Sequence, residues 1–485
     1  MLIDLDLLPN TMSLNQYDVC VCGTGPAGMT VARMLAAQGK TVALFEGGAL
    51  EYTEESQKLY EGKSIGINDW DAVKNCRLRY LGGTSNHWSG LCSYFDEIDF
   101  EMRPNDMSGW IIPRKEIFKY FDLAKDILDL PKESFRTFSW QGKNFKKFIS
   151  AMSPPTRFNG KYLEELKKSK KISLYIHANL TKIQLNNNLT VVKSLNFTNN
   201  KKIDFRFHAK QYVLALGSIE NARMLLANNS QIPYGIGNGG GMVGRCYMEH
   251  MNIRYGRFAS DNPDYWKQGK LHLNPSADLM KKHKIGNGVI SFDPDFPAIS
   301  YGRTRALKQA LRELVCKSGN ITDLSRKLMD FDCPGDGVIT SLIEQSPNMN
   351  SRITLDKVEK DVFGIPKVIT NWQINRYDEN TIRTIGIEAA KEVAKLGVAR
   401  VKLEEFILED SKVIKEIGHH CHQMGTTRMS TTDKEGVVDR NLMVHGVDNL
   451  YMAGSSVFPT GGGCNPTFTV VMMAARLADH LSRKV

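Results

Sequence analysis

A histidine lies within a loop that is otherwise made of residues typical of turns. The segment Gly82–Gly90 reads GGTSNHWSG, with His87 in its second half. Taken alone, this composition is most typical of a solvated surface loop. An imidazole changes its charge near neutral pH and is therefore suited to chemistry. Whether His87 does chemistry depends on what the rest of the chain places beside it.

A second group of reactive side chains is the run HHCH at His419–His422. Imidazoles and thiols are common metal ligands, so the run resembles part of a metal site. Structural metal sites usually combine two separated ligand pairs, and the sequence offers no second pair for this one. The spacing therefore favours a role other than metal binding, and we expect no metal.

The clearest ligand-binding signal is a glycine-rich turn near the amino terminus. An apolar strand leads into Gly23, Gly25 and Gly28 at the spacing G-x-G-x-x-G, and an apolar helical run follows. The glycines permit a tight turn, the approach of a pyrophosphate and close packing of helix on strand. A second β-rich run closes on Glu46, which is positioned to accept hydrogen bonds from a ribose. This unit predicts a dinucleotide site but does not distinguish NAD from FAD.

The carboxy-terminal segment contains another strand, loop and helix start. The residues NLYMAG, ending at Gly454, are typical of a short buried strand. In NPTFTVVMMAARLADHL, a helix is predicted with Asn465 as its N-cap and Pro466 as its first residue. The partial positive charge of such a helix start would stabilise the negative charge of a reduced flavin. NAD enzymes have no such requirement, so this segment favours a flavin.

Length and composition narrow the class of protein. The 485 residues correspond to roughly two or three structural units. The net charge of +10 comes from scattered lysine clusters with acidic residues between them, which argues against a nucleic-acid groove. Nine cysteines form no C-x-x-C pair or disulfide framework, and no secretory signal or membrane-spanning stretch is evident. We expect a soluble cytoplasmic protein that binds a small molecule.

Several motifs together resemble the glucose-methanol-choline (GMC) oxidoreductases. They are the Gly23–Glu46 unit, the GGTSNHW loop, VLALGSIENARMLL at Val213–Leu226, GGGMVGRCYMEH at Gly239–His250 and the stretch from Gly418 onward. The segments HQMGTTRM and NPTFT are most similar to the branch that contains pyranose 2-oxidase. The motifs follow the family order from about Tyr17 to Leu481. The resemblance implies an α/β fold: an FAD-binding Rossmann-like domain and an α+β substrate domain built on a mostly antiparallel sheet.

The same resemblance implies the domain boundaries. Residues 1–250 and 413–485 would form a discontinuous FAD-binding domain, with 101–170 partly a cap or insert. Residues 251–412 would form the substrate-binding domain. β-Leaning pieces such as VITSLIEQ, SRITL and PKVITNWQI and a helix from Glu379 to Lys395 fit this part. A basic segment at 298–330 is compatible with a lid, an oligomer contact or plain surface.

Two catalytic residues follow from the resemblance. His422 and Asn465, 43 residues apart, stand where the family has its catalytic pair above the flavin. A base must take the hydroxyl proton of an alcohol while hydride leaves carbon for flavin N5, and an imidazole of pKa about 6.5 suits this task. Asn465 would orient the hydroxyl, unless its side chain turns back to cap the helix.

The resemblance also implies the residues that contact FAD. His87 would either bond covalently to the flavin 8α carbon or pack against the ring. Ser89 would lie near flavin N5, Leu180 against the adenine, and Gly217 in a turn under the cofactor. The whole set is Gly23, Gly25, Pro26, Ala27, Gly28, Glu46, Gly83, Thr84, Asn86, His87, Trp88, Ser89, Leu180, Gly217, Gly454, Ser455, Asn465, Pro466 and Thr467.

The function expected from the resemblance is FAD-dependent oxidation of a CH–OH group to a carbonyl. The branch suggests a secondary alcohol on a sugar, glycoside or cyclitol. The resemblance is compatible with dioxygen or with another electron acceptor, and it does not specify the oligomeric state. The alternatives are a lyase of the hydroxynitrile type on the same scaffold and a flavoprotein without turnover.

Overall fold

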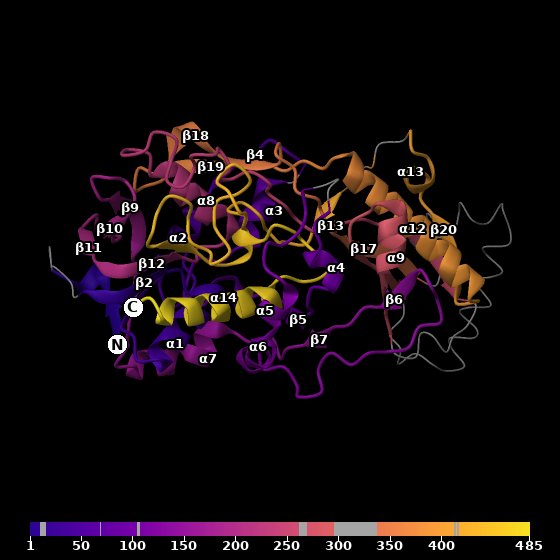
Figure 1. The fold of residues 1–485 in the computed structure, drawn as a ribbon, viewed down its shortest axis with the longest axis horizontal. Helices are drawn as coiled ribbons and strands as arrows, with labels where there is room; N and C mark the ends of the chain where they lie inside the picture. The colour runs from indigo at the N-terminus through magenta and orange to yellow at the C-terminus, as the bar shows by residue number, and fades with distance from the viewer. Residues whose placement is uncertain are drawn as a thin grey trace.

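A parallel sheet of six strands forms one half of the molecule (Figure 1). The computed structural model describes residues 1–9, 16–67, 69–103, 107–260, 269–294, 337–411, 414 and 417–485. The sheet has the order β1 (Leu2–Asp4), β8 (Ile172–Ile176), β3 (Val42–Phe45), β2 (Tyr17–Cys22), β12 (Ala209–Leu214) and β22 (Leu450–Met452). Every neighbouring pair is parallel. Its central strands are apolar and fully buried along most of their length, as expected when helices or further layers cover both faces.

The glycine-rich unit folds as predicted from its sequence. β2 runs into a turn at Gly23, whose φ of +104° favours glycine, and the helix α1 (Pro26–Ala37) follows before β3. The helix begins earlier than the apolar run at Met29 because Pro26 occupies its first turn, where the missing N–H is not needed. A Cβ atom on Gly28 would lie 2.0 Å from the Gly23 carbonyl oxygen. This close approach requires glycine.

The carboxy-terminal helix α14 (Thr467–Ser482) packs against α1. Its inward face is apolar and buried from Phe468 to Leu481. The predicted start of this helix is wrong by one residue: Pro466, in a helical conformation, is the N-cap, and no side chain caps the helix. Asn465 precedes the cap, so its amide is not used by the helix.

A mostly antiparallel sheet forms the other half of the molecule. Its path is β20 (Ala399–Leu403), β14 (Gly256–Ser260), β17 (Gly337–Ile343), β16 (Gly288–Pro294), β15 (Leu271–Pro275) and β6 (Phe145–Lys147). In addition, β13 (Met251–Asn252) pairs with β17, and β21 (Gly418–His419) pairs with β13. The helix α12 (Arg376–Lys395) packs on β20 and β16. It starts before Glu379 because Asn375 and Asp378 form a capping box.

Two strands expected in this sheet pair elsewhere. β18 (Arg352–Lys360) and β19 (Pro366–Asn371) form a separate three-stranded sheet with β4 (Gly62–Ser64). β19 lies parallel to β4, with Val368 opposite Gly62. At Gly62 a Cβ atom would meet the Val368 carbonyl oxygen at 2.5 Å. Glycine thus allows the approach, and the sequence gives no sign of this partner.

The remaining elements complete the layers around the two large sheets (Figure 1). A three-stranded antiparallel sheet contains β9 (Asn179–Leu185), β10 (Val192–Thr198) and β11 (Asp204–Phe207), and α8 (Ser218–Ala227) follows β12. The shorter elements are η1 (Leu5–Leu7), α2 (Glu54–Lys58), α3 (Trp70–Asn75), η2 (Gly83–Asn86), β5 (Leu91–Cys92), α4 (Glu97–Phe100), α5 (Arg114–Phe118), α6 (Phe121–Ile127), β7 (Ala151–Met152), α7 (Phe158–Lys168), α9 (Ala277–His283), α13 (Glu405–Leu408) and η4 (Ser455–Val457).

The predicted domain boundaries at 250 and 412 stay a prediction. All strands of the parallel sheet come from 1–250 and 413–485, whereas β6 and β21 reach the antiparallel sheet from outside 251–412. The basic segment 298–330 lies outside the described residues. Within the part of the chain that the structure describes, no helix is long and apolar enough to cross a membrane.

We expect Gly28→Ala to destabilise the protein by about 1–3 kcal/mol, since the added methyl meets backbone and must displace helix or strand. The matched control is Gly160→Ala in α7, where the methyl meets nothing within 4 Å. This control should be neutral or stabilising by up to about 1 kcal/mol. Thermal unfolding followed by circular dichroism measures both. Equal melting temperatures for the two variants would contradict the packing role of Gly28.

Candidate functional site

A cavity of about 710 Å³ lies at the ends of β2, β3, β12 and β22 and is lined by residues from the front, middle and back of the chain. The residues predicted to contact FAD or substrate that line it are Gly23, Gly25, Pro26, Ala27, Glu46, Gly83, Thr84, His87, Trp88, Ser89, Leu180, Gly217, His422, Gly454, Ser455, Asn465, Pro466 and Thr467. Gly28 and Asn86 are absent from this lining. Gly28 faces the backbone at Gly23, and the Asn86 amide donates to the Leu81 carbonyl at 2.8 Å. Gly28 and Asn86 therefore contact the backbone of neighbouring segments and do not line the cavity themselves.

One end of the cavity has the features of a dinucleotide cradle. The N-cap of α1 is Gly25, and no side chain bonds to the first backbone N–H groups of the helix. A Cβ atom on Gly25 would meet nothing within 4 Å, so the space beside it is open. Free N–H groups and the helix dipole attract a pyrophosphate.

A buried carboxylate lies next to this cradle. Glu46 accepts hydrogen bonds from the Thr24 hydroxyl and, at 2.9 Å, from the Gly48 amide. Each carboxylate oxygen thus has one protein partner and keeps a second lone pair. Since Glu46 lines the cavity, these lone pairs are available to the hydroxyls of a ribose.

At the other end, three residues form a short hydrogen-bonded chain. His250 Nε2 lies 2.8 Å from the Gly462 carbonyl oxygen, and its Nδ1 lies 2.8 Å from His422 Nδ1. A carbonyl only accepts, so His250 carries its proton on Nε2 and its Nδ1 must accept. His422 therefore donates from Nδ1 and keeps an unprotonated Nε2. The backbone amide of His422 is itself held by Glu249 Oε2 at 2.7 Å.

Burial keeps these imidazoles neutral. It is the largest cause that lowers the pKa of His250 to about 4. Burial, followed by repulsion from His250, His420 and His419, lowers the pKa of His422 well below its ordinary value. Burial also raises the pKa of Glu249 to about 8, with the nearby Cys76 as the next cause. The group next to the cavity is thus a neutral imidazole whose Nε2 carries no proton at pH 7.

Asn465 completes this end of the cavity. Its Nδ2 lies 3.5 Å from His422 Nε2, and its Oδ1 is buried without a hydrogen-bond partner. Buried polar atoms are nearly always paired, so a free one on a cavity wall points to a bound ligand. The predicted cap position would have used this side chain, and the observed helix start at Thr467 leaves it free.

His87 follows η2 on the cavity wall. Its Nε2 lies 3.2 Å from the Cys76 carbonyl oxygen, which can only accept. Nε2 therefore carries the proton, and Nδ1 has the lone pair. Gly82 and Gly83, at φ of +89° and +54°, allow the tight turn that presents this loop.

Several side chains at the site have contacts that no sequence motif predicts. His250 and Glu249 end the GGGMVGRCYMEH motif, which indicated their region but not their contacts with His422. No pattern in the sequence points to Cys76, which lines the cavity together with Cys421. A hydrogen bond from Cys421, which outweighs burial, lowers the pKa of the Cys76 thiol to about 7.

Comparison with known proteins identifies the fold. The model of the GMC oxidoreductase carboxy-terminal domain matches residues 347–474, which include His422 and Asn465. A 2-methyl-1,2-propanediol dehydrogenase from Mycolicibacterium austroafricanum is 24% identical over 98% of this chain and 96% of that protein. The fructose dehydrogenase large subunit of Gluconobacter japonicus is also 24% identical, over 60% of this chain, and the match spans only 50% of that subunit.

The structure is also similar to that of a formate oxidase from Aspergillus oryzae RIB40, with a TM-score of 0.61 at 15% identity over 98% of this chain and 99% of that one. The cavity fits FAD, the cofactor of the family, because it combines a pyrophosphate cradle, a buried acid for a ribose and a buried amide oxygen that lacks a partner. Residues 347–474 thus match the carboxy-terminal domain of the GMC oxidoreductases, and the chain as a whole is similar to a dehydrogenase along nearly its full length and to a solved oxidase in its fold.

Proposed function

We propose that this protein is an FAD-dependent oxidoreductase that converts the CH–OH group of an alcohol into a carbonyl, with His422 as the base. The observation that carries the proposal is the unprotonated Nε2 of His422 on the wall of the cavity, 3.5 Å from the Nδ2 of Asn465, whose Oδ1 has no hydrogen-bond partner. A base and a free hydrogen-bonding group at one point of a cavity are what alcohol oxidation requires.

The front of the chain would hold the cofactor. The amino end of α1 at Gly25 would bind the pyrophosphate, Glu46 the ribose, and Leu180 the adenine. FAD supplies the hydride acceptor when it is bound. The amino end of α14, which no side chain caps, would stabilise negative charge at its end of the cavity.

Residues of the carboxy-terminal segment would accept the hydroxyl proton of the substrate. Nε2 of His422 would take the proton of the substrate hydroxyl, while Nδ1 keeps its own proton in the hydrogen bond to His250. That hydrogen bond fixes the ring, so the same nitrogen faces the cavity in every turnover. Asn465 would orient the hydroxyl and stabilise the charge that develops on its oxygen.

A sugar, glycoside or cyclitol is the proposed substrate class. The motifs HQMGTTRM and NPTFT resemble the pyranose 2-oxidase branch, and a related protein is a fructose dehydrogenase subunit. The electron acceptor would be dioxygen or another oxidant, and the protein would act in the cytoplasm. Anaerobic addition of polyols, glycosides and sugars should bleach the flavin absorbance when the right class is present. Product formed with the flavin still oxidised would indicate a lyase, and no reaction with any alcohol would favour a flavoprotein without turnover.

Replacing His422 by alanine should lower the rate of anaerobic flavin reduction by about 100- to 10,000-fold, because the hydroxyl proton loses its acceptor. The flavin content should stay unchanged. Stopped-flow absorbance with the best alcohol of the screen measures the rate. His208→Ala is the control, since His208 is exposed and bonds to the Lys193 carbonyl. A His422→Ala protein that reduces its flavin at the control rate would rule out this base.

Replacing His250 by leucine should slow reduction by about 10- to 100-fold, because His422 would lose the acceptor that sets its protonated nitrogen. His250→Asn keeps an acceptor oxygen and should restore part of the rate. Reduction rate and flavin content are compared at saturating substrate. Equal losses in both variants would mean that His250 acts only through packing.

We further propose that His87 bonds covalently to the flavin through Nδ1, because Nε2 is engaged by the Cys76 carbonyl. Acid denaturation should then leave the yellow colour in the precipitate. His87→Ala should release the flavin to the supernatant under the same conditions. Yellow supernatant from the unaltered protein would show that His87 only packs against the ring.

A further inference from the structure

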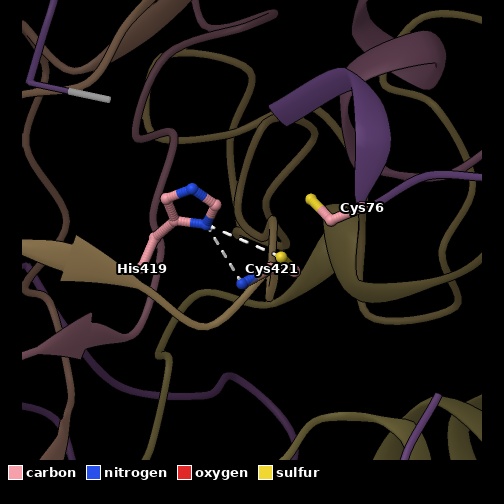
Figure 2. A group of neighbouring side chains, drawn as sticks. All are labelled: Cys76, His419 and Cys421. Carbon is pink, nitrogen blue, oxygen red and sulfur yellow. Dashed lines mark hydrogen bonds between the residues drawn. The ribbon is translucent and has the colours of Figure 1, made fainter. Parts of the chain in front are cut away.

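Beside the cavity, two thiols and an imidazole from distant parts of the chain converge (Figure 2). Cys76 caps the end of α3, His419 ends β21, and Cys421 follows two residues later. Their ligand atoms, two Sγ and the His419 Nδ1, lie within 4.8 Å of one another. We propose that Cys76, His419 and Cys421 form a binding site for Zn²⁺. This inference does not depend on the proposed function.

The separation of the three side chains suits tetrahedral coordination. Zinc bonds of about 2.3 Å to sulfur and about 2.0 Å to nitrogen place neighbouring ligand atoms roughly 3.5–3.8 Å apart. His419 Nδ1 already lies 3.7 Å from Cys421 Sγ. Small side-chain rotations would therefore bring all three atoms to bonding distance of one ion.

The imidazole has its lone pair on the side that faces the sulfurs. The Cys421 backbone N–H donates to His419 Nδ1 at 3.3 Å, so Nδ1 is the unprotonated nitrogen. A metal ion would take this lone pair in place of the Cys421 N–H, and the histidine does not have to change its tautomer to provide it. Figure 2 shows the contact from His419 to Cys421 as dashed lines, with Cys76 on the opposite side.

The two thiols of the cluster can supply the negative charge that a cation requires. The amide Nε2 of Gln423 lies 3.2 Å from Cys76 Sγ, as a hydrogen bond to a sulfur anion would require. The guanidinium of Arg77, which follows Cys76 in the chain, pairs with Glu220 at 2.9 Å. Two thiolates would balance the charge of one Zn²⁺, and their protons would pass to solvent on binding.

The spacing of the three ligands in the sequence does not predict this site, because the fold brings distant segments together. His419 and Cys421 form a pair with one residue between them, and the third ligand is 345 residues away from Cys421 in the chain. Cys421 is exposed, which gives an ion access from solvent. Three protein ligands leave the fourth position open for water or a small ligand. Cys76 and Cys421 both line the cavity, so a bound ion would fasten α3 to the loop that carries His422.

Titration of the full-length, flavin-loaded protein with Zn²⁺ after chelator treatment tests the site. We expect one tightly bound ion per chain, measured by plasma mass spectrometry. X-ray absorption at the zinc edge should show two sulfurs at about 2.3 Å and a nitrogen at about 2.0 Å. Cys421→Ala and His419→Ala should each weaken Zn²⁺ binding by at least about 10-fold. Loss of a residue that only hydrogen-bonds to a metal ligand already lowers the affinity by about this factor.

Two matched variants serve as controls. Cys20→Ala, in the buried strand β2, and His208→Ala, on the surface, should bind Zn²⁺ as the unaltered protein does. In the unaltered protein, Zn²⁺ should also protect Cys421 from alkylation, which keeps the test valid if a variant fails to fold. The proposal is overturned by a shell of nitrogen and oxygen only, by unchanged affinity in Cys421→Ala, by alkylation that Zn²⁺ does not slow, or by a Cys76–Cys421 disulfide in peptide mapping.

Discussion

The pairing of β12 with two partners is the constraint on which the site depends. On one side β12 lies parallel to β2, and on the other it lies parallel to β22, from the last tenth of the chain. Because parallel strands end at the same sheet edge, the loops that follow β2 and β22 are brought together there. The glycine turn after Cys22 and the segment from Gly454 therefore line one cavity, although more than four hundred residues separate them.

The antiparallel sheet positions the two histidines of the candidate catalytic site. β13 pairs with β21, so the chain segments that contain His250 and His422 lie side by side. A backbone carbonyl, which cannot change its role, begins the hydrogen-bonded chain at Gly462, and the direction of every later hydrogen bond follows from it. The protonated nitrogen of His422 is thus set by the main chain through His250. Burial removes the charged forms that would disturb this order.

Local patterns in the sequence predicted the local structure well. The strand, turn and helix from Tyr17 to Ala37 and the strand before Gly454 formed as their apolar spacing indicates. The position of Asn465 was missed by one residue because N-cap statistics favour asparagine over proline, whereas the observed helix begins without a side-chain cap. The sequence did not predict which distant segments would meet. Nothing near Gly62 indicates its pairing with β19, and nothing near Cys76 indicates its contact with the HHCH run. Contacts between distant segments depend on the topology of the whole fold, so the spacing of residues within one segment does not predict them.

The cavity walls draw on elements from both ends of the chain, and this has a consequence for the life of the protein in the cell. A nascent chain without α14 lacks part of the walls, so the complete set of cavity contacts requires this helix. A ligand that binds only the finished fold shifts the folding equilibrium towards it by mass action. The steady-state abundance of the protein should therefore follow the supply of its prosthetic group, and riboflavin starvation would expose newly made chains to proteolysis.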